Sequence, residues 1–133
     1  MSERVRNVLL RSVLLALPVV LVGGLALAFI QQPEPAREVV LVAEGMVFQL
    51  PGDPTPNPTL TAAPGERLRF VLVNQDRGYE HDLRLPSLSA ATPLIPGDGG
   101  RSELMITAPT RTGDYDYLCS THAAMMRGTL RVR

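Results

Sequence analysis

Beyond residue 36, apolar and polar side chains alternate in short runs, and glycine or proline residues separate one run from the next. In residues 67–73, Leu68, Phe70 and Leu72 fall on one face of an extended strand, and two arginines fall on the other. Similar runs occupy residues 39–42, 103–107, 114–119 and 128–133. Helical periodicity is absent from this part of the chain, and short strands between turns are typical of an all-β fold. The pattern therefore predicts an all-β, Greek-key sandwich of antiparallel strands.

Two stretches rich in proline and glycine interrupt the strands, residues 50–58 and 85–100. They predict long loops that cross between the two sheets of the sandwich. The alternation near the C-terminus places Tyr115, Tyr117 and Cys119 on one face of a strand. We also expect two methionines in the core and three acidic residues in a solvated loop, namely Met46, Met105, Asp76, Glu80 and Asp82.

The N-terminal part of the chain has a different pattern. Residues 12–30 form an apolar run without a charge, which as a helix would be about 28 Å long and would span a bilayer. Three arginines precede the run, and basic residues mark the cytoplasmic side of a membrane segment. We therefore expect a single-pass anchor in the cell membrane (residues 1–30), a linker (residues 31–38) and an exported domain, periplasmic or extracellular (residues 39–133).

A cleaved signal peptide is the alternative to an anchor. The small residues Ala26 and Ala28 have the spacing of a cleavage site. Cleavage there would leave a secreted domain without a membrane segment. The apolar run is longer than the apolar region of an ordinary signal peptide, and this length favours the anchor.

Composition narrows the choice of function. The 133 residues include 13 basic and 13 acidic side chains, and every basic one is an arginine. This balance provides no basic footprint for nucleic acid, so we expect no nucleic-acid partner. A chain with a single cysteine can form no internal disulfide. Cys119 is therefore an inert core residue, a reactive thiol, an intermolecular bridge or a metal ligand.

A loop between the last two strands carries the residues capable of metal chemistry. Cys119, His122 and the adjacent Met125 and Met126 bring a thiol, an imidazole and a thioether together, and His81 is the only other histidine. A thiolate, two imidazoles and a weak axial thioether form the ligand set of a blue-copper electron-transfer site. A lone cysteine on a strand is more often a small buried hydrophobe. The spacing of these residues favours a metal site instead.

Four motifs resemble the cupredoxin family, the blue copper proteins of the plastocyanin and azurin kind, and the resemblance spans residues 57–132. They are N-P-T-L-T-A-A-P-G-E-R-L-R-F (57–70), N-x6-H-D-L (74–83), T-G-D-Y-D-Y-L-C-S-T-H (112–122) and H-A-A-M-M-R-G-T-L (122–130). The last motif is similar to the azurin pattern H-x-x-x-M-K-G-T-L, which gives the axial role to Met126. The amicyanin spacing H-x-x-M would select Met125. Thr121 and Asp82 stand where many members have proline and asparagine.

The resemblance implies a type 1 copper protein with one copper ion that changes between Cu(I) and Cu(II). The ligands that it implies are His81, Cys119, His122 and Met126. We expect a one-electron carrier that is tethered to the outer face of the cytoplasmic membrane and meets redox donors and acceptors transiently. The alternative is a copper chaperone or buffer that delivers Cu(I) to a membrane oxidase or an efflux system. A copper-free sandwich that binds other proteins is a third possibility.

The resemblance also implies that one edge of the His122 ring reaches the surface amid Ala123, Ala124 and Met125. A small apolar patch of this kind favours brief docking with redox partners. We expect no enzymatic activity. Zinc-dependent hydrolysis needs an open metal position and a general base, whereas this residue set is soft and fills the coordination sphere. A binuclear copper centre would need two cysteines, and the chain has one.

Overall fold

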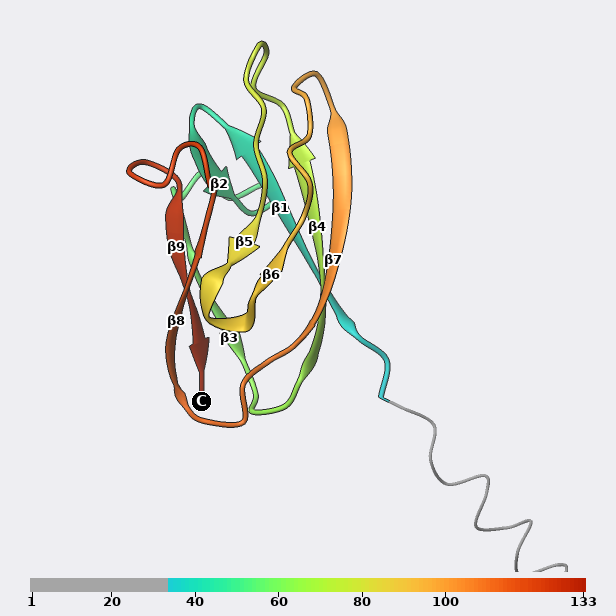
Figure 1. Ribbon diagram of the computed structural model, residues 1–133, viewed down its shortest axis with the longest axis vertical. Coiled ribbons are helices and arrows are strands. Elements are labelled where there is room, and N and C mark those ends of the chain that lie inside the picture. The colour runs from blue at the N-terminus through green and yellow to red at the C-terminus, as the bar shows by residue number, and fades with distance from the viewer. Residues whose placement is uncertain (1–33) are drawn as a thin grey trace, which may run out of the picture. The chain divides into compact units, whose positions relative to one another are not determined.

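The computed structural model describes residues 34–133, which form two β-sheets packed face to face (Figure 1). One sheet has the strand order β2-β1-β4-β7 and the other has the order β3-β9-β8-β5-β6. The elements are β1 (Arg37–Glu44), β2 (Val47–Gln49), β3 (Thr59–Ala62), β4 (Arg67–Asn74), β5 (Arg84–Leu85), the 3₁₀ helix η1 (Pro86–Leu88), β6 (Ala90–Ala91), β7 (Gly100–Thr107), β8 (Gly113–Leu118) and β9 (Arg127–Val132). The predicted all-β sandwich is confirmed.

No helix between residues 34 and 133 is long and apolar enough to cross a membrane. The predicted anchor, residues 1–30, lies outside the described residues.

Two strand pairs run parallel, which corrects the prediction of a purely antiparallel sandwich. β1 pairs with β4 in parallel, with Val39 opposite Phe70, and β3 pairs with β9 in parallel, with Leu60 opposite Leu130. Between β1 and β4 the chain crosses to the second sheet and returns, so β4 enters beside β1 in the same direction. Alternation along a strand predicts which side chains face the core, but it contains no information about the direction of the neighbouring strand.

The core lies between the two sheets and contains the apolar positions that the alternation predicts. Leu68, Phe70 and Leu72 on β4 are fully buried, as are Tyr117 on β8 and Leu130 on β9. Burial of a large apolar side chain stabilises the fold by about 1.5–3 kcal/mol. The core is therefore sufficient to hold the strands in register, and the loops at the end of the sandwich are built on this frame.

Two predictions about methionine and one about loops are wrong. Met105 is 48% exposed, because it lies on the outer face of β7 opposite Arg69. Met46 is only half-buried, and it occupies the turn between β1 and β2. The stretch 85–100 is not one long loop, since it contains the end of β5, η1 and β6. Such short elements contain too few alternating positions to be recognised in a sequence.

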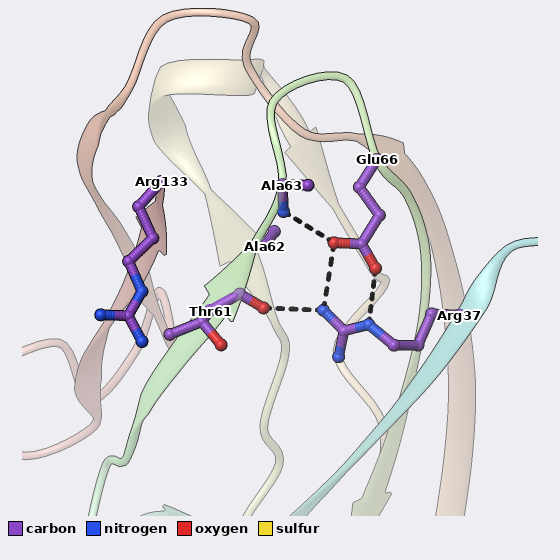
Figure 2. Close-up of a pocket in the computed structure, with 6 residues that line it drawn as sticks. All are labelled: Arg37, Thr61, Ala62, Ala63, Glu66 and Arg133. Atoms are coloured by element: carbon purple, nitrogen blue, oxygen red, sulfur yellow. Dashed lines mark hydrogen bonds and ion pairs between the residues drawn. The ribbon is translucent and has the colours of Figure 1, made fainter.

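An ion pair ties the two sheets together at the end of the sandwich that carries the C-terminus. Arg37 Nε on β1 donates to Glu66 Oε1 at 2.6 Å, and Arg37 Nη2 donates to the carbonyl of Thr61 on β3 at 2.7 Å (Figure 2). Glu66 also accepts a hydrogen bond from the N–H of Ala63 at 2.8 Å. The hydrogen bond from Arg37 lowers the pKa of the Glu66 carboxyl. A hollow of about 310 Å³ lies against these groups and Arg133. Arg37 and Glu66 are already paired there, so the ion pair has a structural role.

Tyr117 connects the core to the segment before β3 and to β9. Its hydroxyl donates to the carbonyl of Pro58 at 2.6 Å, and its ring lies directly beneath Gly128 on β9. A Cβ atom at position 128 would lie 2.2 Å from the Tyr117 ring and hydroxyl. Only glycine allows this close approach of β9 to the ring.

We predict that Gly128→Ala destabilises the fold by about 1–3 kcal/mol, because the added methyl group overlaps the buried ring of Tyr117. Urea unfolding measures the change. Arg127→Ala is the matched control, since Arg127 is exposed on the same strand, and it should change the unfolding free energy by no more than about 0.5 kcal/mol. Equal stability of Gly128→Ala and the unmodified protein would show that the ring moves aside without cost.

Candidate metal centre

Three side chains from two distant stretches of sequence meet at one end of the sandwich. The connections that carry them, after β4 and between β8 and β9, lie at the upper end in Figure 1, opposite the C-terminus. His81 follows β4 in a segment that pairs with Ile95 through two backbone hydrogen bonds, His81 N–H to Ile95 O at 3.1 Å and Ile95 N–H to His81 O at 2.8 Å. Cys119 comes directly after β8, and His122 lies in the loop between β8 and β9. The donor atoms of the three residues lie within 4.8 Å of one another.

The donor atoms form a nearly isosceles triangle. The two imidazole Nδ1 atoms of His81 and His122 are 3.1 Å apart, and Cys119 Sγ is 3.7 Å from each of them. An ion with bonds of about 2.0 Å to nitrogen and about 2.3 Å to sulfur, at about 120° to each other, places a nitrogen and the sulfur about 3.7 Å apart, and two nitrogens 3.1 Å apart correspond to a narrower angle of about 100°. The triangle therefore fits three donors around one metal ion in an approximately trigonal arrangement.

Burial isolates this triangle from water. His81 and Cys119 are fully buried, and His122 is partly exposed. Each of the three groups carries only one proton in its neutral form, so lone pairs as well as protons are directed at the common centre. A positively charged ion at their centre would satisfy all three donors.

Asp76 lies beside the nitrogen of His81 that faces away from the centre. Its Oδ2 atom lies 2.9 Å from His81 Nε2. A carboxylate only accepts, so a proton on Nε2 would satisfy it and would leave the Nδ1 lone pair directed toward Cys119 and His122. Partial burial raises the pKa of the Asp76 carboxyl. Hydrogen bonds from the N–H groups of Met46 and Gly45 and the interaction with the His81 ring lower it, and together they outweigh the effect of burial, so the pKa of Asp76 is lowered.

Asp82 also supports the centre, by a hydrogen bond that the sequence did not reveal. Its side chain is 2% exposed, and Oδ1 accepts a hydrogen bond from the N–H of Ser120 at 2.6 Å. This bond joins the segment after His81 to the residue after Cys119. The prediction of a solvated acidic loop is therefore wrong for Asp82 and for Asp76, whose side chain is 12% exposed, and correct for exposed Glu80. Spacing along the chain does not reveal which carboxylate folds inward.

Backbone hydrogen bonds close the loop between β8 and β9. Cys119 N–H donates to the carbonyl of Met126 at 3.0 Å, and Met126 N–H donates to the carbonyl of His122 at 2.8 Å. Met126 is fully buried in the same cluster as Cys119, whereas Met125 is 52% exposed. Burial thus distinguishes the two methionines between which the motifs left a choice.

Thr121 contacts two of the three donor residues. Its hydroxyl oxygen lies 3.3 Å from Cys119 Sγ and 2.9 Å from His122 Nδ1. The hydroxyl can donate to only one of them at a time, because it has a single proton. A proline at this position would lack the group, so the difference noted in the sequence places a polar contact directly on the sulfur.

The partly exposed edge of the centre has more apolar neighbours than the loop alone predicts. The ring of Tyr79 meets the ring of His122 edge-on, with centroids 6.1 Å apart. Tyr79 and Met125 are each 52% exposed. Tyr79 comes from the connection between β4 and β5 and was not expected in the apolar surface around His122, because only the fold brings that connection beside the loop between β8 and β9.

Asn57 supports the loop between β8 and β9 from the connection between β2 and β3. Its side-chain N–H donates to the carbonyl of Met125 at 2.8 Å, and its Oδ1 accepts from the N–H of Phe48 on β2 at 3.1 Å. The residue has a positive φ of 50°, a conformation that asparagine adopts more readily than most residues. The sequence offered only its place at the start of a cupredoxin-like motif as a signal.

Comparison with known proteins supports the fold. No protein-family profile matches the chain, and no curated protein sequence matches it. Among solved structures it is similar to auracyanin A, described as a "blue" copper protein from Chloroflexus aurantiacus, with 19% identity, a TM-score of 0.59, and 74% of this chain and 100% of that chain covered. Auracyanin from Roseiflexus castenholzii has 17% identity and a TM-score of 0.57, covering 74% of this chain and 98% of that one. Auracyanin B has 21% identity and a TM-score of 0.57, covering 77% and 93%. The chain therefore has the cupredoxin fold.

We predict that Asn57→Gly lowers the unfolding free energy by about 1–3 kcal/mol, because two hydrogen bonds are lost while the positive φ remains favourable. Amide hydrogen exchange in residues 122–126 should become faster. Asn57→Asp serves as the matched variant, since aspartate still accepts from Phe48 but cannot donate to Met125. Exchange in the loop that is unchanged in both variants would contradict a supporting role for Asn57.

Proposed function

We propose that the protein is a type 1 copper electron-transfer protein. His81, Cys119, His122 and Met126 would hold one copper ion, which supplies one-electron Cu(II)/Cu(I) chemistry when bound. The observation that carries this proposal is the triangle of two Nδ1 atoms 3.1 Å apart and a sulfur 3.7 Å from each. A thiolate and a thioether are soft donors that suit Cu(I), and imidazoles suit both oxidation states. The auracyanins with the same fold support the assignment, since auracyanin A is itself a blue copper protein.

The frame around the donors favours an electron carrier because it limits their movement. The backbone of His81 is bonded to Ile95, and the backbone of Cys119 is bonded to Met126. Donors held in this way keep nearly the same positions whether or not an electron is present, so little reorganisation accompanies electron transfer. We propose no catalytic role, because the buried donor set leaves no open position for a substrate.

Electrons would enter and leave by way of the His122 ring, the one ring of the triangle that is partly exposed. The apolar side chains of Tyr79 and Met125, which both lie next to His122, expose about half of their surface. A small apolar surface of this kind supports short-lived contact with redox donors and acceptors. Nothing in this role needs a tight complex, and rapid dissociation favours turnover.

A membrane anchor would keep this carrier near its partners. The uncharged run of residues 12–30 and the arginines before it support a single-pass anchor with the copper domain on the outer face of the cytoplasmic membrane. A tether raises the effective concentration of the domain near membrane-bound donors and acceptors.

Copper loading tests the proposal directly. The oxidised full chain should show strong visible absorption with Cu(II), lose it on reduction, and lack it in Cys119→Ser, because the thiolate is the donor responsible. Spin resonance of the same samples reports the geometry of the site. A protein that remains colourless and copper-free after loading would contradict the proposal. Transfer of Cu(I) to an acceptor without redox cycling would favour the chaperone alternative.

Two methionine variants test the axial donor. Met126→Leu should shift both the visible spectrum and the reduction potential, since Met126 is buried beside Cys119. Met125→Leu should change neither, because Met125 is half exposed, and it is the matched control from the adjacent position. The reverse result would assign the axial role to Met125.

Mass spectrometry of the protein from the membrane fraction tests the anchor. We expect the mass of the chain with residues 1–30 retained, together with resistance to extraction by high salt, because a long apolar segment holds the chain in the bilayer. A soluble exported protein that begins directly after Ala28 would instead establish the cleaved signal peptide.

A further inference from the structure

One carboxylate links the turn between β1 and β2 to the ring of His81. Asp76 Oδ1 accepts from the N–H of Gly45 at 2.6 Å, and Oδ2 accepts from the N–H of Met46 at 2.9 Å. The same Oδ2 atom lies 2.9 Å from His81 Nε2. The side chain of Asp76 is 12% exposed and that of His81 is fully buried. Little water competes for these bonds, which strengthens each of them.

The backbone of Asp76 is held as firmly as its side chain. Its N–H donates to Asn74 Oδ1 at 3.0 Å, and Asn74 Nδ2 donates to the carbonyls of Tyr79 and Ile95 at 2.8 and 3.0 Å. A Cβ atom at Gly97 would lie 2.0 Å from the carbonyl oxygen of Asp76, so the loop before β7 packs directly against it. The position of the Asp76 carboxylate is therefore fixed by these contacts, and the hydrogen bond to it fixes the orientation of the His81 ring.

The turn that faces Asp76 is strained, and the carboxylate offsets the strain. Gly45 and Met46 both have a φ of 63°, as the turn of a two-residue hairpin requires. Met46 is not a glycine, so this left-handed conformation is unfavourable, because its Cβ atom crowds the carbonyl oxygen that follows. Its N–H donates to a charged acceptor, and a hydrogen bond of that kind is stronger than one between neutral groups. The methionine is tolerated at this position because the turn presents both N–H groups to Asp76.

The two histidines of the triangle differ in their support. His122 contacts the Thr121 hydroxyl and the edge of Tyr79, and among residues 34–133 no carboxylate contacts it. Only His81 pairs with an anion. A carboxylate that accepts the Nε2–H proton makes the imidazole a stronger donor at Nδ1 and places a negative charge close to whatever Nδ1 binds.

We propose that Asp76 is the positioning residue of the metal centre, which locks His81 in the Nε2–H tautomer and, by its charge, favours the oxidised form of the bound ion. The second part of this inference rests on the proposed copper function. The first part concerns the protein without metal and stands independently of it. Outer carboxylates of this kind contribute about 10–100-fold in metal affinity. Because the charge acts more strongly on Cu(II) than on Cu(I), its removal changes the ratio of the two affinities.

Asp76→Asn tests the proposal with a nearly isosteric change. In the aspartate, Oδ1 faces Gly45 and Oδ2 faces Met46 and His81. The asparagine amide has only one oxygen, so its NH₂ group must replace one of these two acceptors and face a donor. Asp98→Asn is the matched control. It removes the same charge from the neighbouring loop, but Asp98 is 68% exposed and pairs with exposed Arg77, so solvent screens its effect.

Two measurements on the full chain separate the parts of the proposal. Nitrogen-15 spectra of the metal-free protein should show His81 as a single Nε2–H tautomer in the unmodified protein and in Asp98→Asn, and as a mixture in Asp76→Asn. In the copper-loaded proteins, Asp76→Asn should lower the ratio of Cu(II) to Cu(I) affinity about tenfold. This change raises the reduction potential by about 59 mV for a one-electron couple. The potential of Asp98→Asn should stay close to that of the unmodified protein.

A third variant keeps the test decisive if Asp76→Asn folds poorly. Met46→Gly relieves the strain of the turn, so the double variant of Met46→Gly with Asp76→Asn should fold. Met46→Gly alone should keep the reduction potential of the unmodified protein. A folded, blue Asp76→Asn protein with a single His81 tautomer and an unchanged potential would overturn the role of Asp76. A wild-type protein that binds no copper would overturn the proposed function, and the tautomer measurement would still decide whether Asp76 positions His81.

Discussion

The upper end of the sandwich depends on keeping two imidazole nitrogens and a sulfur within 3.7 Å of one another in a space closed to most water. Groups of this kind do not assemble by their own attraction, because each loses hydration and gains few good hydrogen bonds in return. The backbone supplies the constraint. His81 is paired with Ile95, and the loop from Cys119 to Met126 is closed by its own hydrogen bonds. The donors are therefore held together by structure that exists before any ion binds.

That constraint has a supporting layer of polar side chains. Asp76 fastens the ring of His81 to the turn after β1, Asp82 fastens the residue after Cys119, and Asn57 fastens the carbonyl of Met125 to β2. Each of these residues reaches across a different pair of elements. A blue copper function needs such rigidity, since a centre that keeps its shape passes electrons with little reorganisation. The opposite end of the sandwich, closed by Arg37 and Glu66, has no such requirement and holds the sheets together.

Much of the fold and part of the site can be predicted from residue order, and the limits are physical. Alternation predicted the buried face of β4, and the spacing from Cys119 to His122 predicted a shared loop. The two parallel strand pairs were missed because alternation is the same in parallel and antiparallel sheets. Residue order predicts solvated positions for Asp76 and Asp82, because an acidic side chain near a turn is usually exposed. Their inward orientation depends on N–H groups that other segments present to them.

Residue order alone determined which chemical groups the protein has available: one thiol, two imidazoles and the paired methionines, placed at the ends of alternating strands. It could not determine how these groups are arranged, since an arrangement is a property of segments that lie far apart along the chain. Tertiary structure decided that His81 presents Nδ1 rather than Nε2, that Met126 is buried while Met125 is exposed, and that the ring of His122 lies beside Tyr79. The reason is that tautomer, burial and access to the surface are each determined by neighbours from other strands, and only folding brings those neighbours into contact.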